Sequence, residues 1–308
     1  MASFAAVVVR RFSRHMLRPW LMAGGLDQQR RRFARLAAPR RAVRARIEPA
    51  RHGDLELEWL IPDQVDPQRV RYYLHGGAFV ACSVATHRES VARMARAARA
   101  RALMPEYRLA PEHPFPAALE DCVAGYRFLL QSGIRPEHIV IAGDSAGGAL
   151  TLGTLLSLRD AGDPLPGAAV LLSPATDATL SGQSFSICAE REAMLAEDFC
   201  RTAVRLYLGT HDPRAPLASP LFADLRGLPA LSIHVGTEEL LLDDSLRLAD
   251  RARAAGVETS LRVWDGMWHV FHMFPIPEAA ECVREIGAFA RAHFDTARRE
   301  AAADARAS

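Results

Sequence analysis

The sequence of 308 residues contains no lysine, so arginine supplies all 38 of its basic side chains. This absence excludes Schiff-base chemistry on a lysine and the phosphate-binding lysine of a P-loop. Cysteine is also scarce, with five residues that are scattered along the chain and never form a Cys-x-x-Cys pair. This usage argues against a disulfide framework and a catalytic cysteine. It fits buried thiols in a reducing compartment, so we expect a cytoplasmic protein.

Metal-binding motifs and long hydrophobic runs are also missing. The eleven histidines include no His-Glu-x-x-His or His-x-His pattern. His269 and His272 would lie one turn apart in a helix, but no third ligand accompanies them, so we expect no metal. A short apolar run at residues 4–9 is followed by Arg10 and Arg11. It is too short for a membrane span, and its charges lie on the wrong side for a secretory signal.

Positive charge is concentrated in the N-terminal segment. The formal net charge of the whole chain is +2, which argues against a dedicated nucleic-acid binder. Residues 1–46 hold twelve arginines and a single acid, Asp27, whereas the rest holds 26 arginines and 35 acids. We expect a basic, solvated helical face that partly docks on an acidic body. Contact with an anionic partner or membrane surface is the alternative, and a homodimer stays open.

Strand and helix patterns alternate along most of the chain. Extended runs are predicted at residues 55–61, 70–74, 138–142, 168–172, 230–235 and 259–263, and helices at 87–99, 116–131, 146–159, 245–255 and 277–297. Residues 10–46 predict one or two helices, broken near Gly24-Gly25 and Pro39. The alternation indicates an α/β fold with a mostly parallel sheet and helices on both faces. The active site of such a sheet lies at the carboxyl ends of its strands.

The stretch between Asp177 and Leu228 interrupts this alternation. It contains a helical pattern near residues 193–208 and a proline-rich segment at 213–220, but no strand pattern. An insertion there would face the strand ends and form a lid, while an ordinary long connection is the alternative.

A strand, a sharp turn and a helix surround Ser145. Residues 143–148 read Gly-Asp-Ser-Ala-Gly-Gly, directly after an apolar run and before a helical pattern. This is the Gly-x-Ser-x-Gly nucleophile elbow, in which Gly143 and Gly147 let the strand and helix pass close together. The N-terminus of the helix favours a developing anion beneath the serine. The alternative is a loop that only changes direction.

A glycine-rich loop follows the predicted strand at 70–74. It reads His75-Gly76-Gly77-Ala78-Phe79, close to the His-Gly-Gly-Gly type of oxyanion loop. Its backbone donors would be Gly77 and Ala78, joined by the N–H of Ala146 after the nucleophile. We expect His75 to support the loop and not to act as a base.

The base and the acid of a serine hydrolase should follow later strands. His269 comes after the last strand, although a histidine among aromatics is often an ordinary core residue. The acid should follow the strand at 230–235, where Glu238, Glu239, Asp243 and Asp244 are available. Spacing alone does not choose among these four.

Five ordered motifs resemble those of the hormone-sensitive-lipase-like esterases, a family of α/β hydrolases. The motifs are residues 75–79, 107–117, 143–148, 173–177 and 267–271. The resemblance implies an eight-stranded α/β-hydrolase sheet under a helical cap. It assigns residues 1–45 and 179–215 to the cap, and 46–178 and 216–298 to the catalytic domain. The alanine- and arginine-rich tail, residues 299–308, is expected to be disordered.

The resemblance also implies hydrolysis of esters with short to medium acyl chains, without a cofactor. Matching the family's Asp-Pro-Leu-x-Asp pattern to Asp243 places the catalytic acid at Glu239, with Asp243 as the second choice. Ala78 departs from the family's third glycine, and its Cβ restricts the loop and would narrow the acyl pocket. Asp144 is expected to brace the neighbouring loops. Pro105 predicts a short or irregular strand before the second motif.

The substrate pocket and the bond that is cleaved are less determined by the sequence. Candidate pocket side chains are Trp20, Phe33, Met194 and Tyr207, each of which could also be ordinary packing. Hydrolysis of an amide, carbamate or lactone would use the same three residues. A non-catalytic binding module would keep the pocket but would not need a base at His269.

Overall fold

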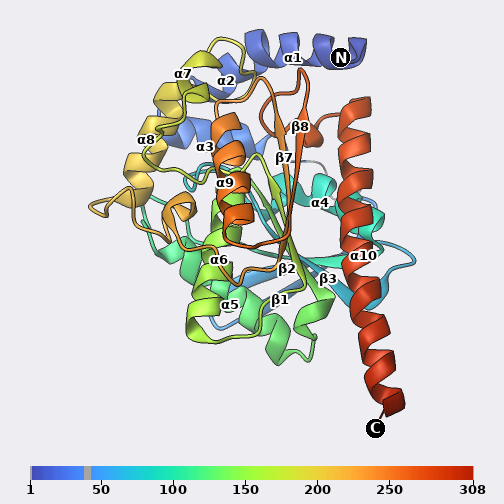
Figure 1. Cartoon of the computed structure of the whole chain (residues 1–308). Coiled ribbons are helices and arrows are strands. Elements are labelled where there is room, and N and C mark those ends of the chain that lie inside the picture. The colour runs from blue at the N-terminus through green and yellow to red at the C-terminus, as the bar shows by residue number, and fades with distance from the viewer. Residues whose placement is uncertain (1, 38–42, 308) are drawn as a thin grey trace.

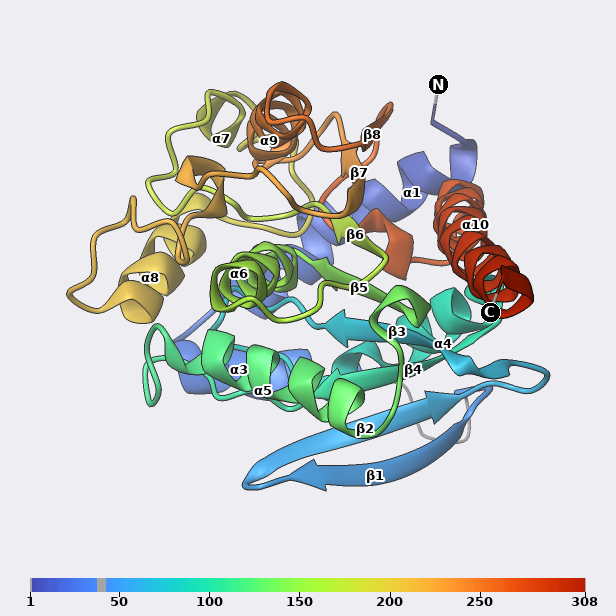
Figure 2. The ribbon, with the colours of Figure 1, turned by 60° about the horizontal axis from the view of Figure 1, so that its bottom comes forward.

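One mixed sheet of eight strands runs through the centre of the molecule (Figures 1 and 2). The computed structural model describes residues 2–37 and 43–307. The strands are β1 (Arg46–His52), β2 (Leu55–Ile61), β3 (Asp66–Leu74), β4 (Ala100–Pro105), β5 (Ile139–Asp144), β6 (Ala168–Leu172), β7 (Ala230–Gly236) and β8 (Thr259–Trp264). Their order is β1-β2-β4-β3-β5-β6-β7-β8. Pairs β1–β2 and β2–β4 are antiparallel, and all the others are parallel.

Helices cover both faces of this sheet. On one face lie α4 (Val84–Ala98) and α10 (Pro277–Ala307), and on the other lie α5 (Ala117–Gln131), α6 (Ala146–Ala161) and α9 (Leu242–Ala254) (Figure 2). Short 3₁₀ turns occur at Pro136–His138, Pro220–Phe222 and Phe271–Met273. Two apolar clusters, one under each helical layer, form the core.

The sequence of β5 explains its central place. Ile139 and Ile141 belong to the cluster under α5 and α6, whereas Val140 and Ala142 belong to the cluster under α4 and α10. Successive side chains of a strand point to opposite faces, so an unbroken apolar run suits a strand that is covered on both. The carboxyl end of β5 therefore lies in the middle of the sheet edge, directly before the Ser145 turn.

Two further helical segments lie outside these layers and pack on each other (Figure 1). The first contains α1 (Phe4–Phe12), a π-helical turn η1 (Ser13–Leu17), α2 (Arg18–Met22) and α3 (Leu26–Ala34). The second joins β6 to β7 and contains α7 (Ser184–Ile187) and α8 (Glu197–Leu208). Arg18 Nη1 donates to the carbonyl oxygens of Ala189 (3.3 Å), Glu192 (2.7 Å) and Leu195 (3.4 Å). The Phe33 and Phe199 rings lie 6.3 Å apart.

The α/β fold with eight strands and helices on both faces is confirmed. Several local expectations are wrong. The antiparallel strand β1 was not predicted. Strand β4 is not short, since it has six residues with Pro105 at its last position, but its pairing with β3 does shift register between Asp66 and Val70. Helix α10 continues to Ala307, where a disordered tail was expected, since alanine, arginine and glutamate are strong helix formers. The expected break near Pro39 lies outside the described residues.

No helix in the described part of the chain is long and apolar enough to span a membrane.

Candidate active site

Ser145 occupies the turn between β5 and α6. Its backbone has φ 53° and ψ −121°, a conformation that costs of order 1–3 kcal/mol. The turn needs its glycines, because a Cβ on Gly143 would overlap the carbonyl oxygen of Gly147, and one on Gly147 would overlap that of Leu74. The N–H of Ser145 donates to the carbonyl of Leu172 (2.8 Å), which ties the turn to β6. The hydroxyl is thus held at the carboxyl end of the sheet.

A continuous hydrogen-bonded chain joins Ser145, His269 and Glu239. Ser145 Oγ lies 2.9 Å from His269 Nε2, and His269 Nδ1 lies 3.0 Å from Glu239 Oε2. All three side chains are buried. The other carboxylate oxygen, Glu239 Oε1, accepts from the N–H of Gly236 (2.6 Å) and the hydroxyl of Ser173 (2.8 Å). These two donors, one at the end of β7 and one just after β6, fix the carboxylate toward the imidazole.

The second-choice acid lies elsewhere. Asp243 is in the first turn of α9, and its Oδ2 accepts from the N–H of Ser184 (2.9 Å) in the inserted segment. It therefore fastens α7 to α9, while Glu239 holds His269. The other two acidic residues after β7 also bond away from the histidine: Asp244 accepts from the N–H groups of Thr176 and Asp177, and Glu238 pairs with Arg10 and Arg191.

The electrostatics around Ser145, His269 and Glu239 make the imidazole of His269 more basic. Burial alone would lower the pKa of His269, but the hydrogen bond and negative charge of Glu239 outweigh it. The pKa of His269 therefore lies above its ordinary value. A carboxylate placed in this way also fixes the tautomer, since Nδ1 carries the proton and Nε2 is left to accept from Ser145.

The loop at residues 75–79 lies beside Ser145. Gly77 has φ +125°, and a Cβ there would overlap the carbonyl oxygen of Ala81. Ala78 has φ +54°, so it adopts a left-handed conformation in spite of its Cβ. Gly77 and Ala78 line the same cavity as Ser145. Ala146 begins α6, so its N–H is among the donors that the helix itself does not use.

Asp144 connects this loop to β3, β5 and α4. Its Oδ1 accepts from the hydroxyl of Tyr73 (2.8 Å) and the N–H of Gly76 (3.1 Å), and its Oδ2 lies 3.4 Å from His87 Nε2. Burial alone would raise the pKa of Asp144, but the charge of His87 and the hydrogen bonds hold it well below its ordinary value. A Cβ on Gly76 would overlap the carboxylate. The network therefore fixes the position of the loop.

His75 anchors the same loop from its other side. Its ring stacks on Tyr107 with 4.1 Å between centroids, and the Tyr107 hydroxyl donates to the carbonyl oxygen of His75 (2.7 Å). Burial lowers the pKa of His75 to about 3, so the ring stays neutral. Its hydrogen-bonding partners are Gly76 and Tyr107, and its position suits support of the loop better than proton transfer to Ser145.

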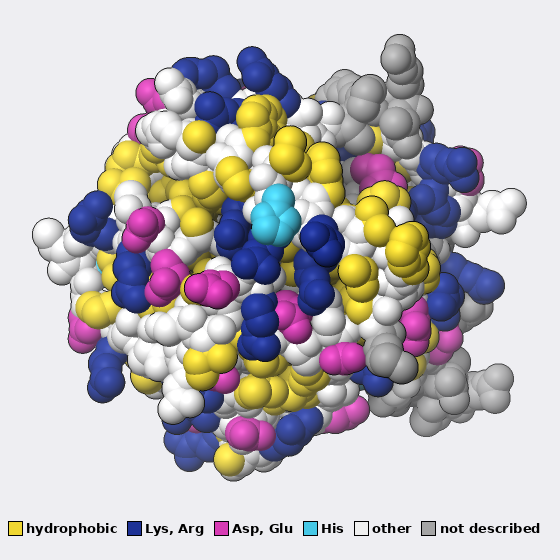
Figure 3. Space-filling model, turned by 90° about the horizontal axis from the view of Figure 1, so that it is seen from above, with side chains coloured by type: hydrophobic (Ala, Val, Ile, Leu, Met, Phe, Trp, Pro, Cys, Tyr) yellow, Lys and Arg dark blue, Asp and Glu magenta, His cyan; other side chains and the backbone are white. Residues whose placement is uncertain are grey.

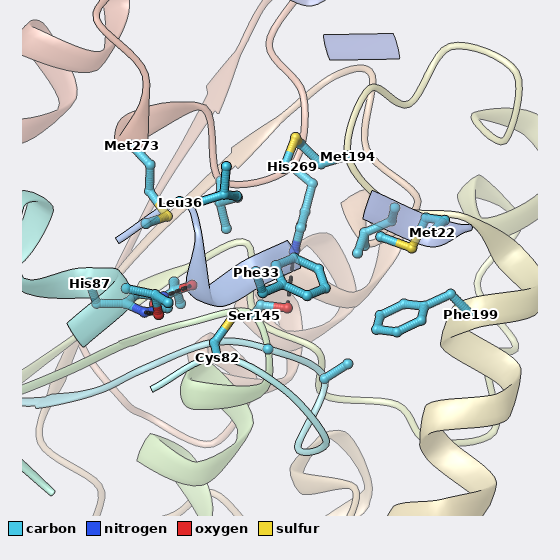
Figure 4. Close-up of a pocket in the computed structure, with 16 residues that line it drawn as sticks. Met22, Phe33, Leu36, Cys82, His87, Ser145, Met194, Phe199, His269 and Met273 are labelled. Carbon is cyan, nitrogen blue, oxygen red and sulfur yellow. Dashed lines mark hydrogen bonds and ion pairs between the residues drawn. The ribbon is translucent and has the colours of Figure 1, made fainter. Parts of the chain in front are cut away.

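An apolar cavity of about 100 Å³ opens onto Ser145. In Figure 4, Ser145 and His269 point toward one another, with hydrophobic side chains around them. The hydrophobic lining comes from both helical segments and from the catalytic body: Met22, Phe33, Leu36, Met194, Leu195, Phe199, Val270 and Met273.

Two of the four predicted pocket residues lie elsewhere. Phe33 and Met194 line the cavity, as expected. Trp20 is on the outer surface, 38% exposed, with the guanidinium of Arg32 over its ring. Tyr207 is buried and stacks on Phe79 at 3.7 Å, so it packs α8 against the loop. The sequence shows that an aromatic residue prefers burial or an interface, but the packing of the helices decides which side it faces.

Two polar residues at the site were not singled out from the sequence. Ser173 orients Glu239, and His87 faces Asp144. Ser173 had a usable signal, because it follows β6 directly at the carboxyl edge of the sheet. His87 lies inside α4 and has no such signal, since its neighbour Asp144 comes from β5.

Comparisons with known proteins agree with this geometry. The family model described as alpha/beta hydrolase fold matches residues 71–273. An acetyl-hydrolase of Streptomyces hygroscopicus is 43% identical over 241 residues, which cover 78% of this chain and 80% of that protein. The solved structure of EstE5 soaked with p-nitrophenyl butyrate is 40% identical, with a TM-score of 0.91, and covers 96% of this chain and 100% of that chain.

A sheet of this topology with a serine at the strand-to-helix turn after β5 defines an α/β hydrolase. The structure of an esterase from the bacterial hormone-sensitive lipase family is 39% identical, with a TM-score of 0.89, and covers 96% of this chain and 100% of that chain. The chain belongs to the α/β-hydrolase family, within its hormone-sensitive-lipase-like branch.

Proposed function

We propose that this protein is a serine carboxylester hydrolase that cleaves short- to medium-chain acyl esters through an acyl-enzyme intermediate. The observation that carries the proposal is the hydrogen-bonded chain from Ser145 through His269 to Glu239, at the floor of an apolar cavity. The order of these residues along the chain, nucleophile, acid and base, is that of α/β hydrolases.

In the first half of the reaction, His269 Nε2 removes the proton of Ser145 as the hydroxyl attacks the ester carbonyl. Glu239 stabilises the imidazolium that forms. The backbone N–H groups of Gly77, Ala78 and Ala146 are the proposed donors to the oxyanion. The imidazolium then protonates the leaving alcohol as the bond to it breaks, which leaves the acyl group on Ser145.

In the second half, water takes the place of the alcohol. His269 removes a proton from the water, which attacks the acyl carbonyl, and the same donors stabilise the second oxyanion. The imidazolium returns the proton to Ser145 as the carboxylic acid leaves. No cofactor is needed for either half of this cycle.

The size of the cavity supports a short acyl chain. At about 100 Å³ it is smaller than an engineered cavity of about 150 Å³ that holds benzene. The proposed cap consists of the N-terminal segment and the inserted segment, since Met22 and Phe33 from the first and Met194 and Phe199 from the second line the cavity. The five cysteines are unpaired, which supports the proposal of a reducing, cytoplasmic environment.

Relatives support an ester as the substrate. One is an acetyl-hydrolase, and the structure of another was determined after soaking with p-nitrophenyl butyrate. Amides, carbamates and lactones are the alternatives with the same three residues. A panel that holds the acyl group constant and varies the leaving group distinguishes them.

Replacement of the nucleophile tests the proposal. Ser145→Ala is expected to lower kcat on p-nitrophenyl acetate by roughly 10⁶, as for loss of the serine in a comparable triad. Ser90→Ala is the matched control, since Ser90 is also buried but lies in α4 and does not line the cavity. Retention of most activity by Ser145→Ala, with Ser90→Ala unchanged, would show that another group is the nucleophile.

A further inference from the structure

Large hydrophobic side chains are exposed at the N-terminal end of the chain. Nine such side chains are exposed among the described residues, and six of them lie within the first twenty positions. These six are Phe4 (85%), Val7 (36%), Val8 (49%), Phe12 (59%), Met16 (62%) and Trp20 (38%). The exposed apolar surface is therefore concentrated on α1, η1 and α2 and is not scattered, which marks an interaction site.

Five of these residues form one line along the helical segment. Phe4, Val8, Phe12, Met16 and Trp20 follow one another at intervals of four, so each lies about one turn from the next. We call these five residues the apolar stripe. The π-helical turn at Ser13–Leu17 holds more residues per turn than an α-helix, and it offsets the drift that a four-residue spacing would otherwise accumulate.

The opposite side of the same segment is fixed to the body. Ala6, Ser13 and Leu21 are fully or almost fully buried, and Ser3 donates through its N–H to the carboxylate of Glu278 on α10 (2.6 Å). The stripe therefore cannot turn inward without detaching the whole segment. A basic, solvated helical face was the expectation for this segment, and the structure adds a row of exposed hydrophobic side chains to it.

The N-terminal segment that carries the stripe is also rich in arginine. Residues 1–46 hold twelve arginines and one acid, and Arg11, Arg31 and Arg35 are exposed. Seen from above, the molecule shows arginine side chains and hydrophobic patches next to each other (Figure 3). Such a surface attracts anions over distances of a Debye length.

The combination of charge and apolar side chains indicates which kind of partner fits this surface. A second copy of the chain would meet the stripe through the same surface and would bring the two arginine clusters together. An anionic lipid surface suits both features, because aromatic and aliphatic side chains enter the boundary between headgroups and acyl chains while arginines meet phosphates. Trp20 at the end of the stripe is of the type enriched at membrane interfaces.

We propose that the N-terminal helical segment docks this protein on an anionic lipid bilayer, with the apolar stripe at the acyl boundary and the flanking arginines on the phosphates. The segment that follows the stripe leads to the proposed active site, since Met22, Phe33 and Leu36 line its cavity and Leu36 is itself 44% exposed. Docking would bring the cavity close to esters that partition into the bilayer.

Vesicle sedimentation tests the docking. The full chain is mixed at low salt with vesicles of phosphatidylcholine alone or with phosphatidylglycerol, and the bound fraction is measured after pelleting. We expect binding to the anionic vesicles that weakens as salt is added. The triple variant Val8→Ser, Phe12→Ser, Met16→Ser should lower the partition coefficient at least tenfold. The triple variant Arg11→Gln, Arg31→Gln, Arg35→Gln should reduce binding to anionic vesicles only.

Matched controls lie on other surfaces. Val263→Ser changes an exposed hydrophobic residue of β8, and Arg51→Gln changes an exposed arginine of β1, so both should bind vesicles as the parent does. Hydrolysis of water-soluble p-nitrophenyl acetate should be the same in all these variants, which shows that they are folded. Ser145→Ala should bind vesicles normally, so failure of the proposed catalysis and failure of docking are separate results.

Three outcomes would overturn the proposal. The first is no pelleting of the parent protein with anionic vesicles at low salt. The second is equal pelleting of the parent and the stripe variant. The third is a dimer, measured by light scattering, that the stripe variant converts to a monomer, because the stripe would then be an interface between two copies.

Discussion

At the scale of single residues, Glu239 and Asp243 offer a direct comparison. Glu239→Gln keeps the size of the side chain but no longer stabilises the imidazolium or fixes its tautomer, so we expect kcat to fall by roughly 10³- to 10⁴-fold. Asp243→Asn should retain turnover within about tenfold, since its bond is to Ser184. Steady-state kinetics on p-nitrophenyl acetate measure both. A larger loss of kcat in Asp243→Asn than in Glu239→Gln would assign the acid to Asp243.

The pH dependence of turnover follows from the same contact. His269 must be neutral at Nε2 to accept the proton, and its pKa lies above the ordinary value of about 6.5. We therefore expect kcat/KM to fall as the pH drops through a value above about 6.5. In Glu239→Gln the stabilising charge is lost, so the residual activity should have its acid limb at lower pH. An acid limb at the same pH in both proteins would mean that Glu239 does not determine the pH at which activity is lost.

The residues that the structure brings together at the candidate site could be predicted from the sequence where their signals are local. Ser145 and the loop at 75–79 follow strands directly, and the glycines there are required by close backbone approaches. His269 and Glu239 follow the last two strands, whose carboxyl ends a parallel sheet brings to one edge. Trp20 and Tyr207 were assigned wrongly, because nothing in an aromatic residue's own sequence neighbourhood says which neighbour it will face.

At the scale of elements, the joint between the two helical segments that line the cavity is the most informative place to perturb. Arg18 donates to three carbonyl oxygens of the segment between β6 and α8, and it is only partly exposed. Arg18→Met should destabilise the protein by about 1–2 kcal/mol, through the loss of charged hydrogen bonds. It should also raise KM more than it lowers kcat, because the cavity lining moves while Ser145 and His269 stay in place.

Thermal unfolding and Michaelis–Menten kinetics measure these two effects. Arg14→Met is the control, since it removes an arginine one turn earlier that makes none of these three hydrogen bonds. If the two variants behaved alike, the Arg18 contacts would contribute nothing to the cavity.

Strand β1 shows why one element could not be predicted. Its seven residues include Pro49, and none of them is buried, so the alternation that identifies a half-buried strand is weak. The strand exists because its backbone pairs along its whole length with β2, whose apolar residues were recognised. The pattern thus predicted the partner and missed the strand that depends on it.

At the scale of the whole molecule, the C-terminal end of α10 extends beyond the sheet (Figure 1). Phe294 is the last buried side chain described on this helix. Deleting residues 299–308 should therefore leave kcat unchanged and shift the Tm by less than about 2 °C. Deleting residues 292–308 removes Phe294 and should lower the Tm clearly, since loss of a buried aromatic side chain costs roughly 3–5 kcal/mol. Differential scanning calorimetry measures both, and equal losses would assign a structural role to the last ten residues.

The π-helical turn at Ser13–Leu17 makes the length of the N-terminal segment as important as its composition. Each residue of a helix adds a rotation of about 100°. Loss of one residue here would rotate everything after it by about 100° relative to everything before it. Leu21 would then turn out of the core, and Trp20 would turn away from the line of Phe4 and Phe12. The segment should consequently accept many substitutions during evolution but few insertions or deletions, and homologues without the extra residue should carry their exposed hydrophobic positions in a different register.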